Sequence, residues 1–233
     1  MSEDADIIVK LDDVHKIYQQ GKIEVPALRG LDLVVRKGEF MALTGPSGSG
    51  KTTALNIIGG LDKPSKGSVE VEGRNLATMS RSELSRMRRD KIGFVFQAYN
   101  LVPVFSAFEN AETVLRLQGV GTDERRKRIM KLLAEVGLEG MENRRPAEMS
   151  GGQQQRVAIA RAIAPDPVVT LADEPTANVD SKTAEMLLAL MERLNRERNV
   201  TFIFSTHDPR VMARARRVVH MIDGKVDSDK VKD

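Results

Sequence analysis

The sequence predicts an α/β fold built around a mainly parallel, doubly wound sheet, and three observations support this prediction. Short apolar stretches alternate with helical stretches along most of the 233 residues. Several apolar stretches are continuous rather than alternating, as parallel strands covered on both faces require. A glycine-rich loop follows one of these stretches and precedes a helical one.

The expected elements begin with extended stretches at residues 7–18, 31–35 and 40–44, followed by a helical stretch at 51–58. Later strands are expected at 68–71, 92–96, 168–172, 200–205 and 218–222. Asp223 and Gly224 then predict a tight hairpin turn near the end of the chain.

Capping boxes mark three helix starts, because each places a hydroxyl three residues before an acid or amide that completes the cap. The pairs are Ser80 with Glu83, Ser106 with Glu109, and Ser150 with Gln153. Between Ser106 and Ser150 the pattern is helical only, which predicts a helical lobe inserted into the α/β core. Its apolar positions are Leu115, Leu117, Ile129, Leu132, Leu133 and Val136.

Composition narrows the possible classes of protein. A chain that is 41% hydrophobic and 30% charged can bury a full core, as one domain or as one domain with an inserted lobe. The net charge of +3 is spread among many acids, which indicates a solvated surface. Without cysteine, disulfides and cysteine zinc sites are excluded. The acidic segment 1–6 predicts no secretory signal, and no apolar run reaches the roughly 18 residues that span a bilayer.

The glycine-rich loop predicts a phosphate site. Glycines allow positive φ, so successive N–H groups can face an anion, and the following helix start adds positive potential. In a P-loop the lysine reaches the β- and γ-phosphates and the following hydroxyl holds Mg²⁺. The loop consists of Gly45, Pro46, Ser47, Gly48, Ser49, Gly50, Lys51 and Thr52.

Two carboxylates end the later apolar stretch at 168–172. Adjacent residues on a strand point to opposite sides, so one acid can face a metal while the other faces a water. We assign Asp173 to the Mg²⁺ shell and Glu174 to the attacking water as general base.

A second helix start with small residues, Ser150-Gly151-Gly152-Gln153, offers a second anion site on the same chain. Two such sites suggest that two copies of the chain close each other's nucleotide site in a two-fold dimer.

These residues, taken in order, resemble the ATP-binding-cassette family over nearly the whole chain. Tyr18 matches the aromatic that stacks on adenine, and residues 45–52 match Walker A. Gln97 matches the glutamine that senses Mg²⁺ and the γ-phosphate. Met149 to Gln153 match the signature segment, Asp173 and Glu174 match Walker B, and His207 matches the switch histidine.

The resemblance implies a fold and a division of the chain. The fold class is α/β: a P-loop NTPase core with a mainly parallel sheet, an N-terminal antiparallel β part and an inserted α-helical subdomain. The whole chain, 1–233, is expected to form one cassette, with residues 1–97 and 165–233 as a RecA-like core with a β subdomain. Residues 98–164 are then the helical subdomain that carries the signature segment.

The resemblance also implies the site and its ligands. The cofactors are ATP and Mg²⁺; the catalytic residues are Glu174, His207 and Gln97, and the metal residues are Thr52, Gln97 and Asp173. Tyr18, the whole loop and Thr53 bind ATP, while Ser150, Gly151, Gly152 and Gln153 contact the nucleotide of the other subunit. Two departures occur: Met149 replaces a leucine, and Asn178 lies where many members have alanine, although Asp180 of the same segment is retained.

Within the family, the chain is most similar to the lipoprotein-releasing and macrolide-export group (LolD and MacB type). The similarity implies a transport ATPase that lies on the cytoplasmic face of the inner membrane, forms a homodimer with ATP, drives a separate permease and binds no nucleic acid. Stretches 25–30, 96–101 and 145–148 carry it. The alternatives are a signalling cassette like the cell-division relative FtsE, or a soluble cassette ATPase that acts on DNA or ribosomes.

Aromatic residues gather around Gln97, and they are Phe94, Phe96, Tyr99, Phe105 and Phe108. We expect the two on the strand to belong to the core, and the loop at 99–105 to form a groove for a helix of the membrane partner.

Overall fold

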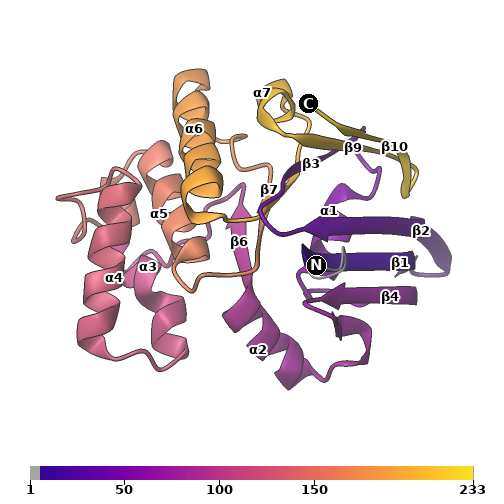
Figure 1. Cartoon of the computed structure of the whole chain (residues 1–233), viewed down its shortest axis with the longest axis horizontal. Coiled ribbons are helices and arrows are strands. Elements are labelled where there is room, and N and C mark those ends of the chain that lie inside the picture. The colour runs from indigo at the N-terminus through magenta and orange to yellow at the C-terminus, as the bar shows by residue number, and fades with distance from the viewer. Residues whose placement is uncertain (1–5, 233) are drawn as a thin grey trace.

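The computed structural model describes residues 6–232, which form two sheets with helices around them (Figure 1). Except for Asp6, the acidic segment 1–6 lies outside the described residues, so the prediction made for it stays a prediction. None of the helices in the described range is long and apolar enough to cross a membrane.

The larger sheet has the strand order β10-β9-β3-β8-β7-β6, and all its neighbouring strands are parallel except β10 and β9. The smaller sheet is antiparallel, with the order β2-β1-β4-β5. This arrangement confirms the predicted fold class. The strands are β1 Ile7–Gln20, β2 Ile23–Arg36, β3 Phe40–Thr44, β4 Lys66–Val71, β5 Arg74–Asn75, β6 Ile92–Phe96, β7 Val169–Asp173, β8 Phe202–Ser205, β9 Arg217–Ile222 and β10 Lys225–Val231.

The central strands are buried on both faces and separate two apolar cores. On β3, Phe40 and Ala42 face one core, and Met41 and Leu43 face the other. The first core joins the sheet to the helical lobe, and the second joins it to α1 and the antiparallel sheet. This burial explains why these strands are continuous apolar runs in the sequence.

Three helices begin where the capping boxes predict. The side chains of Ser80, Ser106 and Ser150 each accept a hydrogen bond from the backbone N–H three residues on. The helices are α1 Lys51–Ile58, α2 Arg81–Lys91, α3 Ala107–Leu117, α4 Thr122–Glu135, α5 Gly151–Ile163, α6 Ser181–Arg198 and α7 Pro209–Arg214, and the 3₁₀ turns are Leu76–Thr78 and Pro146–Glu148.

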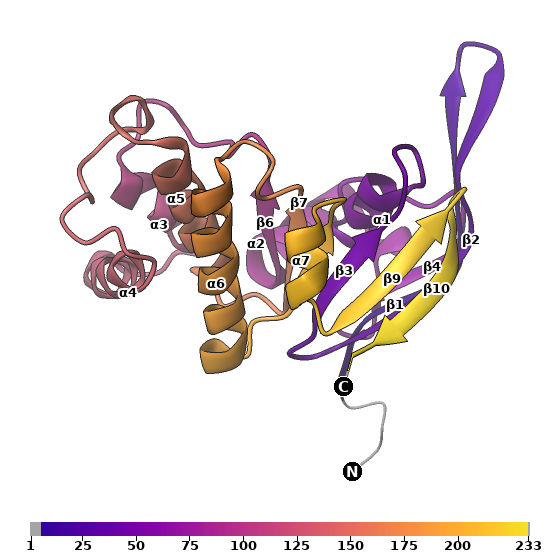
Figure 2. The same cartoon turned by 90° about the horizontal axis from the view of Figure 1, so that it is seen from above.

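The inserted lobe consists of α3, α4 and the start of α5, at the end of the molecule opposite the antiparallel sheet (Figure 2). Five of its six predicted apolar positions are buried, but Leu117 is 64% exposed because it lies at the end of α3. The core of the lobe is continuous with that of the sheet. The subdomain boundaries at 98 and 164 therefore stay a prediction.

The start of β2 differs from the sequence prediction, which began this strand at residue 31. The strand begins at Ile23, and β1 and β2 form a hairpin that projects from the body (Figure 2). Ile23 and Val25 are exposed, and Pro26 lies between them and the buried part. Since β2 is an edge strand, it tolerates a proline that obscures the pattern.

Candidate functional site

The loop at residues 45–52 lies between the end of β3 and the start of α1, as the sequence predicts. Its glycines have positive φ, 139° at Gly45 and 99° at Gly50. A Cβ at Gly45 would lie 2.1 Å from the backbone oxygen of Met221, and one at Gly50 would lie 2.6 Å from that of Ala27. Only glycine fits these positions, so the tight curve of the loop depends on them.

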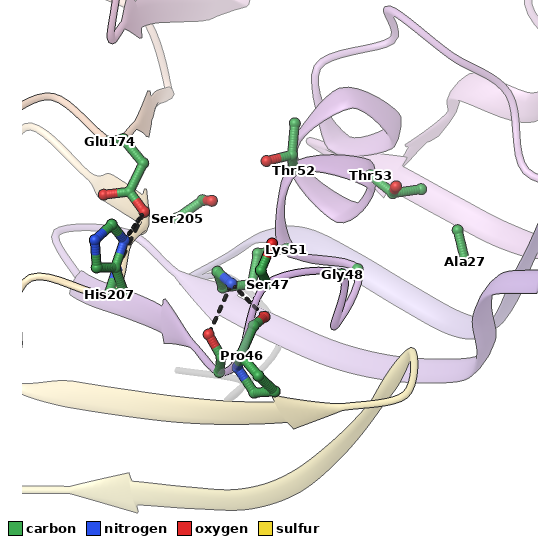
Figure 3. A pocket seen from close by; sticks show the side chains of 12 residues that line it. Ala27, Pro46, Ser47, Gly48, Lys51, Thr52, Thr53, Glu174, Ser205 and His207 are labelled. Atoms are coloured by element: carbon green, nitrogen blue, oxygen red, sulfur yellow. Dashed lines mark hydrogen bonds and ion pairs between the residues drawn. The ribbon is translucent and has the colours of Figure 1, made fainter. Parts of the chain in front are cut away.

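An open cavity of about 660 Å³ lies over this loop (Figure 3). It is lined by Ala27, Gly45, Pro46, Ser47, Gly48, Gly50, Lys51, Thr52, Thr53, Glu174, Ser205 and His207. The loop, the end of β7 and the end of β8 therefore meet at one edge of the sheet, where parallel strands present their carboxyl ends.

Donors for an anion gather in this cavity. The ammonium of Lys51 donates hydrogen bonds to the backbone oxygens of Gly45 (2.8 Å) and Pro46 (2.9 Å), so it lies over the loop (Figure 3). The hydroxyl of Ser205 is buried and has no hydrogen-bond partner among the described residues. Free donors and an uncompensated cation suit a phosphate group.

Thr52 and Asp173 form the candidate metal position. The Thr52 hydroxyl donates to Oδ1 of Asp173 at 3.2 Å, from the first turn of α1 to the end of β7. Among residues 6–232 no group of three or more His, Asp or Glu side chains surrounds a metal position. Mg²⁺ needs no such cage, since it is commonly held by one or two protein oxygens, waters and the phosphates of its nucleotide. The residues present therefore fit Mg²⁺.

Glu174 lies directly after β7 with a φ of 44°, an uncommon value for a residue other than glycine. Its Oε1 contacts Nδ1 of His207 at 2.6 Å and accepts from the His207 backbone N–H at 3.2 Å. Its Oε2 accepts from the Thr206 hydroxyl at 2.9 Å. The Glu174 side chain is only 19% exposed. The Glu174 carboxylate is thus held by the segment that follows β8, whereas Asp173 contacts Thr52 of α1.

Gln97 does not line the cavity, although it was predicted as a catalytic and metal residue. Its side-chain amide is 3.4 Å from Oδ1 of Asn178, and its backbone oxygen accepts from the Asn178 amide at 3.0 Å. Asp180, two residues on, caps α6 through the backbone N–H of Thr183. The Thr183 hydroxyl, together with the Thr183 backbone N–H, holds the pKa of Asp180 below its usual value. Asn178, noted in the sequence as a departure, is thus a structural link to Gln97.

The signature segment also lies outside the cavity of its own chain. Ser150 caps α5, and a Cβ at Gly151 would lie 2.7 Å from the Tyr99 hydroxyl. A Cβ at Gly152 would lie 2.3 Å from the Thr183 side chain. The segment therefore adjoins the two segments that carry Gln97 and Asp180, and its helix start is not aimed into its own phosphate loop.

Tyr18 lies on the projecting hairpin beside the loop. Its hydroxyl donates to Oδ2 of Asp62 at 2.9 Å and lies within reach of the Thr53 hydroxyl, which lines the cavity. Burial raises the pKa of Tyr18 above its ordinary value. The Lys16 ammonium lies 4.9 Å from the ring centre. Tyr18 itself does not line the cavity, so adenine stacking stays a prediction.

Sequence reasoning missed three contributors to the site. Ala27 lines the cavity because the projecting β2 passes beside the loop, and Ser205 lines it from the end of β8. The turn at Asp223 and Gly224, predicted only as a hairpin, also supports the loop. The Gly224 N–H donates to the Ser49 backbone oxygen at 3.1 Å, and its own backbone oxygen accepts from Arg29 at 3.0 Å. No local pattern signals these long-range contacts.

The aromatic residues of β6 are half-buried, so the expectation that both belong to the core holds only in part. Phe94 packs against the second core, and the rings of Phe94 and Phe96 are stacked with their centres 5.6 Å apart. They line a separate groove of about 370 Å³, together with Leu61 and Asn100. Tyr99, which was expected to form this groove, instead donates to the backbone oxygen of Asn178. The groove is therefore built from the strand and only partly from the loop.

Residues 28–177 match the family model described as ABC transporter. The chain belongs to the ABC transporter family. It is an ATPase cassette of that family, and the resemblance to the lipoprotein-releasing and macrolide-export group is confirmed by its relatives.

One relative is the lipoprotein-releasing system ATP-binding protein LolD of Chromohalobacter salexigens, which is 44% identical over 96% of this chain and 94% of its own length. The macrolide export ATP-binding/permease protein MacB of Syntrophobacter fumaroxidans is 45% identical over 95% of this chain. The chain spans only 31% of that MacB.

Among solved structures, the dimeric ATP-binding cassette MJ0796 of Methanocaldococcus jannaschii, in a post-hydrolysis state with ADP and Pi, is similar with a TM-score of 0.88. It is 44% identical and covers 96% of this chain and 98% of its own.

Proposed function

We propose that this cassette binds Mg²⁺ and ATP, dimerises head to tail on ATP and hydrolyses it to drive a membrane permease of the lipoprotein-releasing or macrolide-export type. It acts at the cytoplasmic face of the inner membrane. The observation that carries the proposal is the separation of the signature segment from the phosphate loop of its own chain. A site that lacks its second anion-binding helix is completed by another copy in opposite orientation.

In the proposed reaction, the phosphate loop and the residues at the ends of β7 and β8 have distinct roles. The loop N–H groups and Lys51 hold the β- and γ-phosphates, and Glu174 accepts the proton of the attacking water. His207 orients Glu174 and faces the same cavity, where it is 79% exposed on its side chain. Thr52 and Asp173 hold Mg²⁺, which when bound neutralises charge on the phosphate oxygens.

The test of this proposal is Glu174→Gln, which keeps the size of the side chain and removes its basicity. ATP binding survives, ATP drives a stable dimer, and hydrolysis falls by roughly 10² to 10⁴, the typical contribution of a general base. Size-exclusion chromatography with and without Mg·ATP measures the dimer. A variant that hydrolyses at the rate of the unmodified chain, or that stays monomeric with bound ATP, contradicts the proposal.

The permease is proposed to dock at the groove beside β6. Leu61 is 49% exposed there, next to the stacked Phe94 and Phe96. The groove lies between the sheet and the helical lobe, since it is lined from α2, β6, α3 and α5. An apolar face of a cytoplasmic helix fits this lining. The MacB relatives are described as ATP-binding/permease proteins, which supports a partner of this kind.

Leu61→Asp tests the docking site, because it puts a charge into an apolar contact without touching the cavity over the loop. We expect the cassette to be lost from the membrane fraction of its host while its ATPase activity in isolation persists. The matched control is Val231→Asp, which charges another exposed apolar residue, 74% exposed and remote from the groove. Equal membrane retention of both variants contradicts docking at this groove.

A further inference from the structure

The buried hydroxyl of Thr206 lies within hydrogen-bond distance of the Glu174 carboxylate. Thr206 follows β8 and is 0% exposed. Its backbone N–H donates to the backbone oxygen of Leu43 at 3.1 Å, so the residue is fixed to the end of β3, immediately before the phosphate loop. Nothing in the family resemblance, the match or the names of the relatives assigns a role to this hydroxyl.

The direction of the Thr206 hydrogen bonds follows from their donors. The backbone N–H of Asp208 can only donate, and it donates to Oγ1 of Thr206 at 3.0 Å. The hydroxyl proton is therefore free to point at Oε2 of Glu174, 2.9 Å away, and an ionised carboxylate can only accept. Thr206 is thus a donor to Glu174 when Glu174 is charged.

Asp208 is itself held firmly in place. Its Oδ2 accepts from the Thr176 hydroxyl at 2.9 Å, and its Oδ1 accepts from the backbone N–H of Arg210 at 2.9 Å. The Arg210 guanidinium adds an ion pair at 2.7 Å. That guanidinium holds the pKa of Asp208 below its usual value, with the backbone N–H of Arg210 and the Thr176 hydroxyl acting in the same direction. The N–H that orients Thr206 therefore belongs to a residue with little freedom to move.

Three of the acceptor positions of the Glu174 carboxylate are in use. A carboxylate offers about four such positions, two on each oxygen. The backbone and ring of His207 use both positions of Oε1, and Thr206 uses one of Oε2. The position that remains is on Oε2, the oxygen that Thr206 holds.

We propose that Thr206 is a positioning residue for ATP hydrolysis, whose hydroxyl fixes Oε2 of Glu174 as the oxygen that takes the proton of the attacking water. This rests on the proposed role of Glu174 as general base. The proton passes from water to Oε2, the hydroxide oxygen bonds to the γ-phosphorus, and the bond to the ADP oxygen breaks. Thr206 donates to Oε2 throughout and exchanges no proton with it.

Thr206→Val removes the hydroxyl and keeps the branched shape, and Thr206→Ser keeps the hydroxyl. Hydrogen bonds to charged groups contribute about 1.5–3 kcal/mol, which corresponds to a fall in kcat of about 10- to 100-fold for the valine variant. The KM for ATP stays within about 2-fold, since the phosphate loop is untouched. The serine variant retains most of the activity, because it keeps the donor to Oε2 of Glu174.

The matched control is Thr201→Val, because Thr201 is also buried and its hydroxyl accepts from one backbone N–H, that of Gly38, at 2.9 Å. It is expected to lose thermal stability while kcat and the KM for ATP stay unchanged. If Thr206→Val does not fold, Thr206→Cys, whose thiol is a weak donor, takes its place with the same expectation.

The outcomes separate this inference from the proposed function. Thr206→Val with unmodified kcat, alongside an inactive Glu174→Gln, overturns the role of Thr206 alone. Thr206→Ser that is as slow as Thr206→Val also overturns it, because the hydroxyl is then not what matters. Glu174→Gln with unmodified turnover overturns the general base itself.

Discussion

The phosphate loop and the signature segment are both helix starts with free N–H groups, yet they lie in different surroundings. The loop precedes α1 and opens into a cavity that also contains Glu174 and His207. The signature segment precedes α5 and adjoins Tyr99 and Thr183, outside that cavity. The same local chemistry is therefore surrounded by the groups proposed as catalytic in one place and not in the other.

This difference teaches that a helix start becomes a reaction site through its neighbours. Both segments can attract an anion through backbone N–H groups and the helix dipole. Only the loop has the proposed base, Glu174, and the proposed metal position, Thr52 with Asp173, beside it. In the proposed head-to-tail dimer, one chain thus provides the chemistry at one end and a completing surface at the other.

The largest predicted effect distinguishes the phosphate loop from the signature segment through ATP binding and ATP hydrolysis. Lys51→Met removes the ammonium over the loop, so we expect weakened ATP binding by the single chain and a fall in hydrolysis of about 10²- to 10³-fold or more. Gly151→Asp puts a negative charge where the other copy's phosphate is expected. Its Cβ requires the Tyr99 hydroxyl to move, while an acid in the first helical turn favours the helix. It should abolish hydrolysis and leave ATP binding by the single chain intact. Calorimetry and a phosphate-release assay measure both, and equal loss of binding in both variants would refute the distinction.

A smaller effect is predicted for Arg161 of α5, the helix that begins at the signature segment. Arg161 of α5 donates to the backbone oxygens of Tyr99 (2.9 Å) and Asn100 (2.5 Å). Both of these residues have positive φ, 57° and 51°. Burial lowers the pKa of Arg161, and its planar fork presents one N–H donor to each of two successive carbonyls in a fixed geometry that a flexible lysine does not reproduce.

Arg161→Met is therefore expected to lower the free energy of unfolding by about 1.5–3 kcal/mol and to slow hydrolysis, with ATP binding by the single chain preserved. Arg161→Lys should recover part of the stability only. Denaturant unfolding measures the difference in unfolding free energy. A methionine variant as stable as the unmodified chain would show that the loop at Tyr99 and Asn100 keeps its conformation without Arg161.

The smallest predicted effect concerns pH. The folded pKa of Asp208 lies below the ordinary 3.8, so its ion pair stabilises the folded chain above that pH. Stability is lost as the pH falls from 3.8 through the folded pKa. Asp208→Ala, which also removes the cap of α7, should lower the unfolding free energy by about 1–2 kcal/mol at pH 7, and the deficit should shrink below pH 3.8. A deficit independent of pH would mean that packing, and not charge, is responsible.

Local patterns predicted the elements whose burial is uniform. The strand, loop and helix around residues 40–58 appear where expected, because β3 is apolar throughout and the glycines mark the curve. The capping boxes gave the starts of α2, α3 and α5, since a cap is a contact between residues three apart. These interactions are short in sequence, so the sequence contains their signal.

Several contacts between segments that are distant in the sequence were not predicted. Phe94 and Phe96 were expected in the core, but whether a strand face meets a helix or a groove depends on segments far away in the sequence. Ala27 and the Gly224 turn reach the loop because the antiparallel hairpins fold against it, and Ser205 reaches it because β8 pairs with β3 in the larger sheet. The residue types alone carry no sign of these partners.

The central claim, that each nucleotide site is shared by two chains, is tested most directly by mixing two inactive variants. Lys51→Met spoils the loop and Gly151→Asp spoils the signature segment, so a dimer with one copy of each retains one intact site. If dimers form at random, half of those in an equal mixture are of this kind, and about a quarter of the unmodified activity is expected to return. A mixture as inactive as its two components would contradict the shared site.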